Sequence, residues 1–183
     1  MKSFGFVFPG QGSQSIGMLA DIAAEFSEVV DTYAEASDIL SYDLWRIAQK
    51  GPEEILAQTQ YTQPILLAGS YAIWRIIQAQ TKLKPTLLAG HSLGEYTALV
   101  CSDALSFQNA VRLVSLRGRA MQKAVPMGKG ALAAIIGLDD DVVSEICTKA
   151  ALDNEILSPA NFNCPGQIVI AGNIEAVNSR KHF

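Results

Sequence analysis

The sequence predicts an α/β fold with two domains, and three observations lead to this class. Short apolar runs alternate with longer segments of helical periodicity, which is typical of a parallel sheet with right-handed crossovers. A Gly-x-Ser-x-Gly pattern at residues 90–94 stands between one such apolar run and a helical segment. A glycine-rich connector at residues 126–130 precedes segments with a different order. We therefore predict a large α/β domain over residues 1–127 and a small domain over residues 128–183.

The composition of the 183 residues is that of a globular protein, with 49% hydrophobic and 17% charged residues. The formal net charge of −4 comes from 14 basic and 18 acidic residues without long charge runs, which argues against nucleic acid as a partner. No apolar run approaches the roughly 18 residues of a membrane helix, and the N-terminal residues do not resemble a signal peptide. We therefore expect a cytoplasmic protein without a membrane partner.

The cysteines Cys101, Cys147 and Cys164 are odd in number and have neither a close pairing nor a histidine cluster near them. Such a set supports neither a disulfide framework nor a zinc site. We predict buried or idle thiols, and no metal or cofactor.

Residues 4–8 predict a first strand, central in its sheet because it is apolar on both faces. The following loop, residues 9–14, contains Gly10 and Gly12, which allow the backbone to approach a ligand or another loop. A dinucleotide-binding pattern would need glycine where Ser15 stands. Exposed amides serving an anion and a plain turn both remain open for this loop.

Helical patterns follow over residues 20–40 and in a short segment from Tyr42. Thr62, Gln63 and Pro64 predict the start of another helix with proline in its first turn, and residues 65–77 are apolar on nearly every face. Ser106 is a predicted N-cap for a helix that runs to about residue 125.

The Gly-x-Ser-x-Gly pattern has the context of a nucleophile elbow. Residues 87–89 predict a buried strand and residues 93–100 a helix, which would place Ser92 at the apex of a strained turn. Glycine is needed at positions 90 and 94 because a Cβ there would collide with the neighbouring strand and helix. The alternative is a tight turn with an inert serine.

One charged residue falls on the predicted inward face of the helix after Ser106. Helical spacing places these residues on that face: Ala110, Leu113, Val114, Arg117, Met121 and Ala124. A guanidinium on an apolar face is costly unless an anion pairs with it. Arg117 is therefore either a snorkelling or internally paired arginine, or a clamp for a substrate carboxylate.

The segment after the connector predicts the order strand, helix, strand, strand, helix. The strands are expected at residues 131–137, 156–163 and 167–171, with a helix from Asp139 to about residue 151 and another from Asn173. This order is that of a ferredoxin-like unit without its last strand.

Five motifs together resemble those of bacterial malonyl-CoA:acyl carrier protein transacylases. They are Phe-Pro-Gly-Gln-Gly-Ser-Gln at residues 8–14, Thr-Gln-Pro at 62–64, Gly-His-Ser-Leu-Gly-Glu-Tyr at 90–96, Arg-Gly-Arg-Ala-Met-Gln at 117–122 and Asn-Phe-Asn-Cys-Pro-Gly-Gln at 161–167. The resemblance implies an α/β-hydrolase-like large domain interrupted by a ferredoxin-like small domain. It also implies transfer of malonyl groups from malonyl-CoA to acyl carrier protein in fatty acid synthesis, by an enzyme that is a monomer when complete.

The resemblance also assigns roles to residues. Ser92 would be the nucleophile of a ping-pong reaction, and the amides of Gln11 and Leu93 would form the oxyanion hole. Arg117 would bind the malonyl carboxylate. Gln63, Met121 and Asn163 match positions that line the acyl or pantetheine site.

The chain departs from the family pattern at the catalytic base. In the family the catalytic histidine lies far downstream of the nucleophile, whereas the histidines here are His91, beside Ser92, and His182 near the end. We expect neither to serve Ser92, and we interpret the chain as the N-terminal part of the enzyme, poorly active by itself and with some apolar surface uncovered. Two alternatives remain, a serine thioesterase or esterase with the same elbow and a non-catalytic module that binds coenzyme A or acyl carrier protein.

Overall fold

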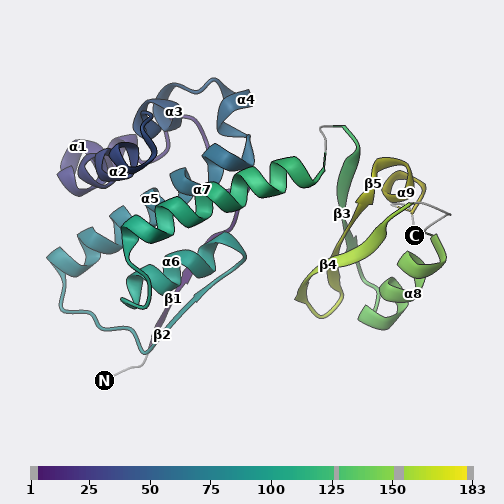
Figure 1. The fold of residues 1–183 in the computed structure, drawn as a ribbon. Helices are drawn as coiled ribbons and strands as arrows, with labels where there is room; N and C mark the ends of the chain where they lie inside the picture. Colours follow the sequence, from purple (N-terminus) through teal and green to yellow (C-terminus); the bar gives the residue numbers. More distant parts are fainter. Residues whose placement is uncertain (1–3, 126–127, 151–154, 181–183) are drawn as a thin grey trace. The chain divides into compact units, whose positions relative to one another are not determined.

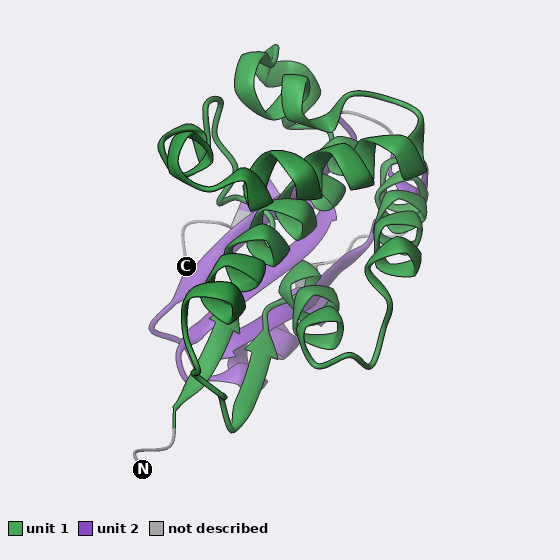
Figure 2. Cartoon of the chain, turned by 90° about the vertical axis from the view of Figure 1, so that its left-hand side faces the viewer, with its two compact units in different colours: residues 1–122 green, residues 123–183 purple. Residues whose placement is uncertain are grey.

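The structure, a computed structural model, describes residues 4–125, 128–150 and 155–180. It has helices and both parallel and antiparallel strands, which confirms the predicted α/β class. The chain divides into two compact units, Met1–Gln122 and Lys123–Phe183 (Figure 2). This division lies a few residues before the boundary between residues 127 and 128 that the glycine-rich connector predicts.

The sheet of the first unit pairs β1 (Gly5–Phe8) with β2 (Leu87–Gly90) in parallel. Phe6 and Phe8 of β1 face the helices, and Phe8 packs with residues of α6 (Leu93–Cys101). On the opposite face Val7 is 79% exposed and Leu87 is 64% exposed. The prediction that these strands are buried on both faces is therefore wrong for the described residues, and the uncovered apolar surface that the sequence leads us to expect lies here.

Helices make up most of the first unit (Figure 1). Besides α6 they are α1 (Ala20–Glu25), α2 (Ser27–Leu40), α3 (Leu44–Lys50), α4 (Glu53–Leu56), α5 (Thr59–Gln80) and α7 (Phe107–Ala124). The main core is formed by fully buried side chains of α2, α5, α6 and α7, among them Tyr33, Ile65, Leu67, Leu93 and Val114. The first unit therefore holds its short sheet against a larger helical core.

Helix α5 begins earlier than the sequence predicts. It starts at Thr59, so Pro64 lies inside the helix and not in its first turn. The backbone N–H of Thr62 already donates to the Gln58 carbonyl at 2.9 Å, so a helical turn is hydrogen-bonded before the proline is reached. The prediction that the following residues are buried is confirmed for Ile65 and its neighbours.

Helix α7 confirms the predicted N-cap but not the predicted inward face. The Ser106 hydroxyl accepts a hydrogen bond from the Asn109 N–H at 3.4 Å. Leu113, Met121 and Ala124 are exposed, contrary to prediction, and the buried residues are Phe107, Ala110, Val111, Val114, Ser115 and Gly118. Gly118 explains this rotation because a Cβ on it would lie only 2.6 Å from the Thr59 carbonyl oxygen of α5. The two helices thus approach most closely at a glycine.

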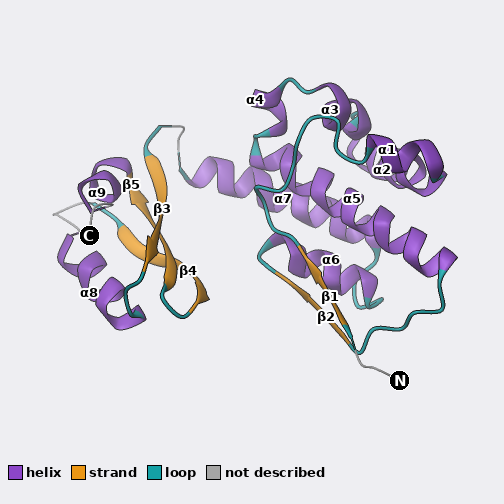
Figure 3. Cartoon of the chain, turned by 180° about the vertical axis from the view of Figure 1, so that it is seen from behind, coloured by secondary structure: helices purple, strands orange, loops and turns teal. Residues whose placement is uncertain are grey.

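The second unit contains the predicted order of elements (Figure 3). They are β3 (Gly130–Ile136), α8 (Asp140–Ala150), β4 (Leu157–Cys164), β5 (Gln167–Asn173) and α9 (Ile174–Arg180). The strands form an antiparallel sheet in the order β3-β5-β4. Ile168 and Ile170 of β5 pack with Val143 and Cys147 of α8 and Val177 of α9, so this unit has a core of its own.

A search of the described residues for a helix both long and apolar enough to cross a membrane finds none.

The close approach at Gly118 leads to a stability prediction. Replacing a helical glycine by alanine ordinarily stabilises a protein by about 0.5–1 kcal/mol. Gly118→Ala should instead destabilise this chain by about 1–3 kcal/mol, because the new methyl group would push α7 away from α5. Urea denaturation followed by circular dichroism measures the change. Arg112→Ala, an exposed change on the same helix, should stay within about 0.5 kcal/mol.

The thiols differ in accessibility, which leads to a second prediction. Cys164 is exposed, whereas Cys101 and Cys147 are buried. Burial, with a smaller contribution from the Asp103 carboxylate, raises the pKa of the Cys101 thiol to about 12, and burial also raises the pKa of the Cys147 thiol. Because the thiolate is the reactive form, a disulfide reagent at about pH 8 should modify only Cys164 in the native chain. Cys164→Ser should abolish this reaction, and rapid modification of a second thiol without denaturant would contradict the prediction.

Candidate active site

Ser92 occupies the sharp turn between β2 and α6. Its backbone has φ 53° and ψ −105°, a conformation that residues other than glycine rarely adopt. The preceding residue continues the sheet, since the His91 N–H donates to the Phe8 carbonyl at 3.3 Å. The next residue, Leu93, begins α6. Ser92 itself is exposed, so the turn presents its hydroxyl at the surface of the described chain.

The glycines of the motif are required by packing. A Cβ on Gly90 would lie 2.0 Å from the carbonyl carbon of Gly94, and a Cβ on Gly94 would lie 2.2 Å from the Phe8 carbonyl oxygen. Both distances are far below van der Waals contact, and both involve backbone atoms that cannot move aside. The steric reason given for glycine at these positions is thus confirmed.

Arg117 of α7 reaches Ser92. Its Nη2 donates a hydrogen bond to Ser92 Oγ at 3.1 Å, and its guanidinium carbon lies 5.6 Å from the ring centroid of Tyr96 on α6. Among the described residues no carboxylate forms an ion pair with Arg117, although Arg75 and Lys149 each have one. The internally paired interpretation of Arg117 therefore does not hold within this part of the chain. Arg117 is thus a half-buried cation whose hydrogen-bond partner is the neutral hydroxyl of Ser92.

Gln63 and Met121 contact each other across α5 and α7. Gln63 on α5 is fully buried, and its Nε2 lies 3.2 Å from the Met121 sulfur on α7. Its Oε1 has no hydrogen-bond partner among the described residues. A buried amide oxygen without a partner is rare in proteins and is often found where a ligand or water completes the site.

Gln11 lies in the exposed loop after β1. Its side-chain Nε2 donates to Thr59 Oγ1 at 3.3 Å, which connects the loop to the start of α5. The loop is also stabilised from within, because the Gly12 N–H donates to Gln14 Oε1 at 2.8 Å and the Ser13 hydroxyl donates to the Gly10 carbonyl at 3.0 Å.

Leu93 and Asn163 complete the set of predicted site residues. Leu93 has a buried side chain, and because it is the first residue of α6 its N–H has no partner within the helix. Asn163 is exposed on β4 and belongs to the second unit.

Among the described residues, no imidazole forms a hydrogen bond with Ser92 through which it could accept the hydroxyl proton. His91 turns toward the loop after β1, where its Nδ1 lies 3.0 Å from the position of a Cβ built on Gly10, and it makes no hydrogen bond to Ser92. His182 lies outside the described residues. The partner found for the Ser92 hydroxyl is thus a guanidinium, which donates protons and cannot accept one.

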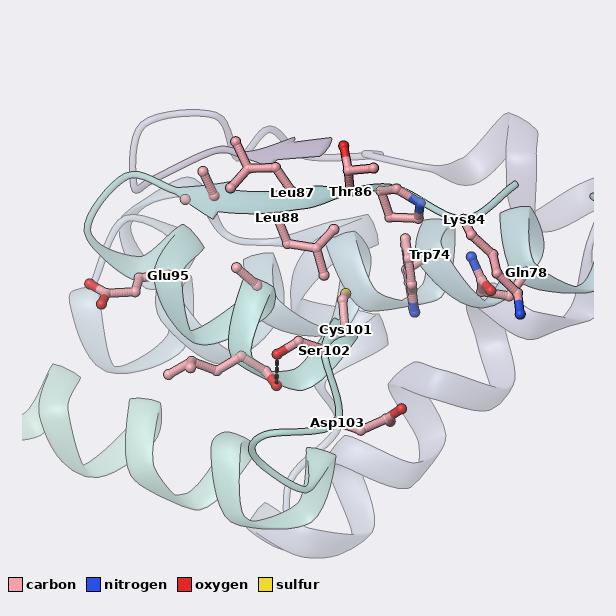
Figure 4. Close-up of a pocket in the computed structure, with 15 residues that line it drawn as sticks. Trp74, Gln78, Lys84, Thr86, Leu87, Leu88, Glu95, Cys101, Ser102 and Asp103 are labelled. Carbon is pink, nitrogen blue, oxygen red and sulfur yellow. Dashed lines mark hydrogen bonds between the residues drawn. The ribbon is translucent and has the colours of Figure 1, made fainter. Parts of the chain in front are cut away.

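A groove of about 820 Å³ runs along β2 close to the turn (Figure 4). Trp74, Leu88 and Cys101 line its middle, with Lys84 toward one end and Glu95 toward the other. Neither Ser92 nor Arg117 lines it. The groove is therefore separate from the cluster around the nucleophile.

Sequence analysis missed two contacts of the site. Tyr96, over which the Arg117 guanidinium lies, stands four residues after Ser92 and so on the same side of α6. Thr59, whose hydroxyl accepts a hydrogen bond from Gln11, precedes residues 62–64, where the sequence predicts the start of the helix. The spacing could have indicated Tyr96, whereas the contact of Thr59 depends on tertiary structure.

An exposed serine in a strained strand-turn-helix elbow is typical of α/β proteins in which a serine hydroxyl attacks an acyl carbonyl group. The sequence profile described as the acyl transferase domain matches residues 5–181. The chain belongs to this acyl transferase family.

Curated relatives are 56% identical to the chain over 177 residues in Salmonella typhimurium and in Escherichia coli strain K12, and 42% identical over 172 residues in Staphylococcus aureus strain COL. Each is named malonyl CoA-acyl carrier protein transacylase. The matches cover 97%, 97% and 94% of this chain but only 57%, 57% and 55% of the relatives. The chain thus spans little more than half the length of the curated relatives it matches.

Solved structures agree with these relatives. One from Coxiella burnetii, described as the malonyl CoA-acyl carrier protein transacylase, superposes with a TM-score of 0.92 at 52% identity, covering 97% of this chain and 56% of that one. Another, described as a type II PKS acyl-carrier protein in complex with its malonyl-transacylase, gives a TM-score of 0.92 at 56% identity, covering 97% of this chain and 57% of that one.

The absence of a described base at Ser92 leads to a prediction about reactivity. Acylation of Ser92 by malonyl-CoA in this chain should be at least about a thousandfold slower than in the Escherichia coli relative, because members of such a catalytic set act as a unit. Intact-protein mass spectrometry over a time course measures the adduct, and Ser92→Ala should give none. A rate comparable to that of the relative would show that the hydroxyl has a base in this chain.

Proposed function

We propose that the chain carries the nucleophile and the carboxylate clamp of a malonyl transferase that acts from malonyl-CoA to the phosphopantetheine thiol of acyl carrier protein. The observation that carries the proposal is Arg117, a half-buried guanidinium without a described acidic partner, at 3.1 Å from Ser92 Oγ. Such a cation fits an acyl group that ends in a carboxylate. The relatives of the same family, named as transacylases of malonyl-CoA and carrier protein, support this choice of substrates.

In the proposed reaction Ser92 Oγ attacks the thioester carbonyl of malonyl-CoA, its proton passes to a base, and the coenzyme A thiolate leaves. The carrier protein thiol then attacks the acyl-serine and releases the Ser92 hydroxyl. The N–H groups of Leu93 and Gln11 would stabilise the oxyanion of each tetrahedral intermediate. Support for these roles comes from the free N–H at the start of α6 and from the contact that ties the Gln11 loop to α5.

The remaining residues are assigned to the acyl and pantetheine site. Gln63 and Met121 would line it beside Arg117, and the unpartnered Gln63 Oε1 supports a polar ligand contact there. Asn163 on β4 of the second unit is assigned a substrate-binding role by its motif position alone. The groove along β2 is left out of this assignment because neither Ser92 nor Arg117 lines it.

We further propose that the first unit is part of an α/β-hydrolase-like domain and the second part of a ferredoxin-like domain, with the boundary near residues 127 and 128. The parallel pair β1 and β2 with its elbow supports the first assignment. The antiparallel order β3-β5-β4, with the connection β-α-β-β-α, supports the second. A cytoplasmic location and a monomeric complete enzyme are part of the same proposal.

The two alternative functions are less well supported. A generic thioesterase or esterase has no need of a half-buried cation beside its nucleophile, and a binding module has no need of a serine in a strained turn. A stable malonyl adduct on Ser92 marks the transferase. Turnover without an adduct or a thiol acceptor would mark a hydrolase, and the absence of both in a longer chain that supplies a base would mark a binding module.

Arg117→Ala tests the carboxylate clamp. In a longer chain that also supplies a base for Ser92, this change should raise the activation free energy of malonyl transfer by about 2–4 kcal/mol, the cost of losing one partner of a desolvated charge pair. Acetylation by acetyl-CoA should suffer less or improve, since an acetyl group has no carboxylate. The two rates are compared by intact mass under identical conditions, with Arg112→Ala, an exposed change on the same helix, as the control. Equal losses for both acyl groups would make Arg117 a structural residue.

A further inference from the structure

The hydrogen bond between Arg117 and Ser92 joins a full charge to a neutral hydroxyl. A carboxylate carries a charge opposite to that of a guanidinium and can accept two parallel N–H···O bonds from it, whereas a hydroxyl offers a single neutral oxygen. Arg117 Nη2 holds Ser92 Oγ at 3.1 Å, and no described carboxylate pairs with the guanidinium. A carboxylate that reaches this position should therefore bind the N–H groups of Arg117 more strongly than the Ser92 hydroxyl does.

The position of the guanidinium is restricted on two sides. Tyr96 presents its ring 5.6 Å from the guanidinium carbon, and Ser92 Oγ accepts from Nη2. A Cβ on the adjacent Gly118 would lie 2.6 Å from the Thr59 carbonyl oxygen of α5, so the backbone that carries Arg117 packs closely against α5. The side chain can exchange partners here without a shift of the helix.

The same contact affects the nucleophile. A hydroxyl oxygen attacks through a lone pair, and the lone pair of Ser92 Oγ that accepts from Arg117 is directed at a cation. While this hydrogen bond persists, that lone pair is not free for a carbonyl carbon.

We propose that Ser92 and the carboxylate of the incoming acyl group compete for Arg117, so that a carboxylated acyl group releases the nucleophile and a neutral acyl group does not. The exchange replaces Nη2–H···Oγ by Nη2–H···O⁻ and needs no other reactant. The inference rests on the proposed malonyl transfer. It adds that the carboxylate of the acyl group changes the reactivity of Ser92 as well as the affinity for the acyl group.

The test uses monomethyl malonate, which has one carboxylate and one ester carbonyl in the arrangement of a malonyl thioester. Its affinity for the isotopically labelled chain is measured by chemical-shift titration, following the signals of Tyr96 and Arg117. Ser92→Ala removes the competing acceptor and should tighten binding roughly three- to tenfold, as expected from the net strength of one hydrogen bond. Ser102→Ala is the matched control, because the Ser102 hydroxyl bonds to the Leu99 carbonyl and not to Arg117.

Two further measurements complete the design. Arg117→Ala should abolish the titration, and dimethyl malonate, which has no carboxylate, should give no response in any variant. Ser92→Gly should also tighten binding, because it removes the same acceptor, and it keeps the test decisive if the alanine variant does not fold, since glycine adopts the φ of 53° without strain.

An unchanged or weaker affinity in the Ser92 variants would overturn the competition while leaving the carboxylate clamp in place. A chain that does not respond to monomethyl malonate with or without Ser92 would instead overturn the clamp itself, and the proposed function with it. The two failures are therefore distinguishable in one set of titrations.

Discussion

The contact between the backbones of β1, β2 and α6 at the elbow determines where the chemistry of this chain is placed. With Cβ positions of Gly90 and Gly94 only 2.0 and 2.2 Å from neighbouring backbone atoms, the strand and the helix meet at a separation that other residues do not allow. The turn between them is short, and Ser92 takes up the strain with a positive φ. The position of Ser92 is thus defined by backbone geometry and does not depend on the flexibility of a loop.

A second close approach places the other member of the pair. Gly118 brings α7 against the first turn of α5, and the residue before it is Arg117. The same start of α5 holds the Gln11 loop through Thr59 and carries the buried Gln63. Three predicted site residues from separate parts of the chain are thereby positioned around one helix end. Packing between glycines and backbone, more than any salt bridge, organises this region.

Local signals in the sequence were sufficient for much of the fold and for the strained turn that carries Ser92. The elbow and the β-α-β-β-α order depend on residue type and short-range periodicity, so they could be predicted closely. The inward face of α7 could not be predicted, because periodicity alone does not show that the side of α7 carrying Gly118 packs against another helix. The start of α5 was missed because a helix already hydrogen-bonded at Thr62 tolerates Pro64 in its second turn. The exposure of Val7 depends on which elements cover a sheet, which no local pattern encodes.

The sequence predicted the position of Arg117 on its helix but not the contacts of its guanidinium. Spacing on the helix indicated that a cation faces the apolar side, but it could not indicate that the cation meets a hydroxyl and an aromatic ring in place of a carboxylate. Leaving a half-buried guanidinium without an acidic partner costs stability, because its desolvation is only partly offset by a neutral hydrogen bond. A chain that paired Arg117 internally would be more stable but would have no free cation for a ligand. Without an acidic partner among the described residues, Arg117 retains the charge and the N–H donors that the proposed carboxylate contact requires.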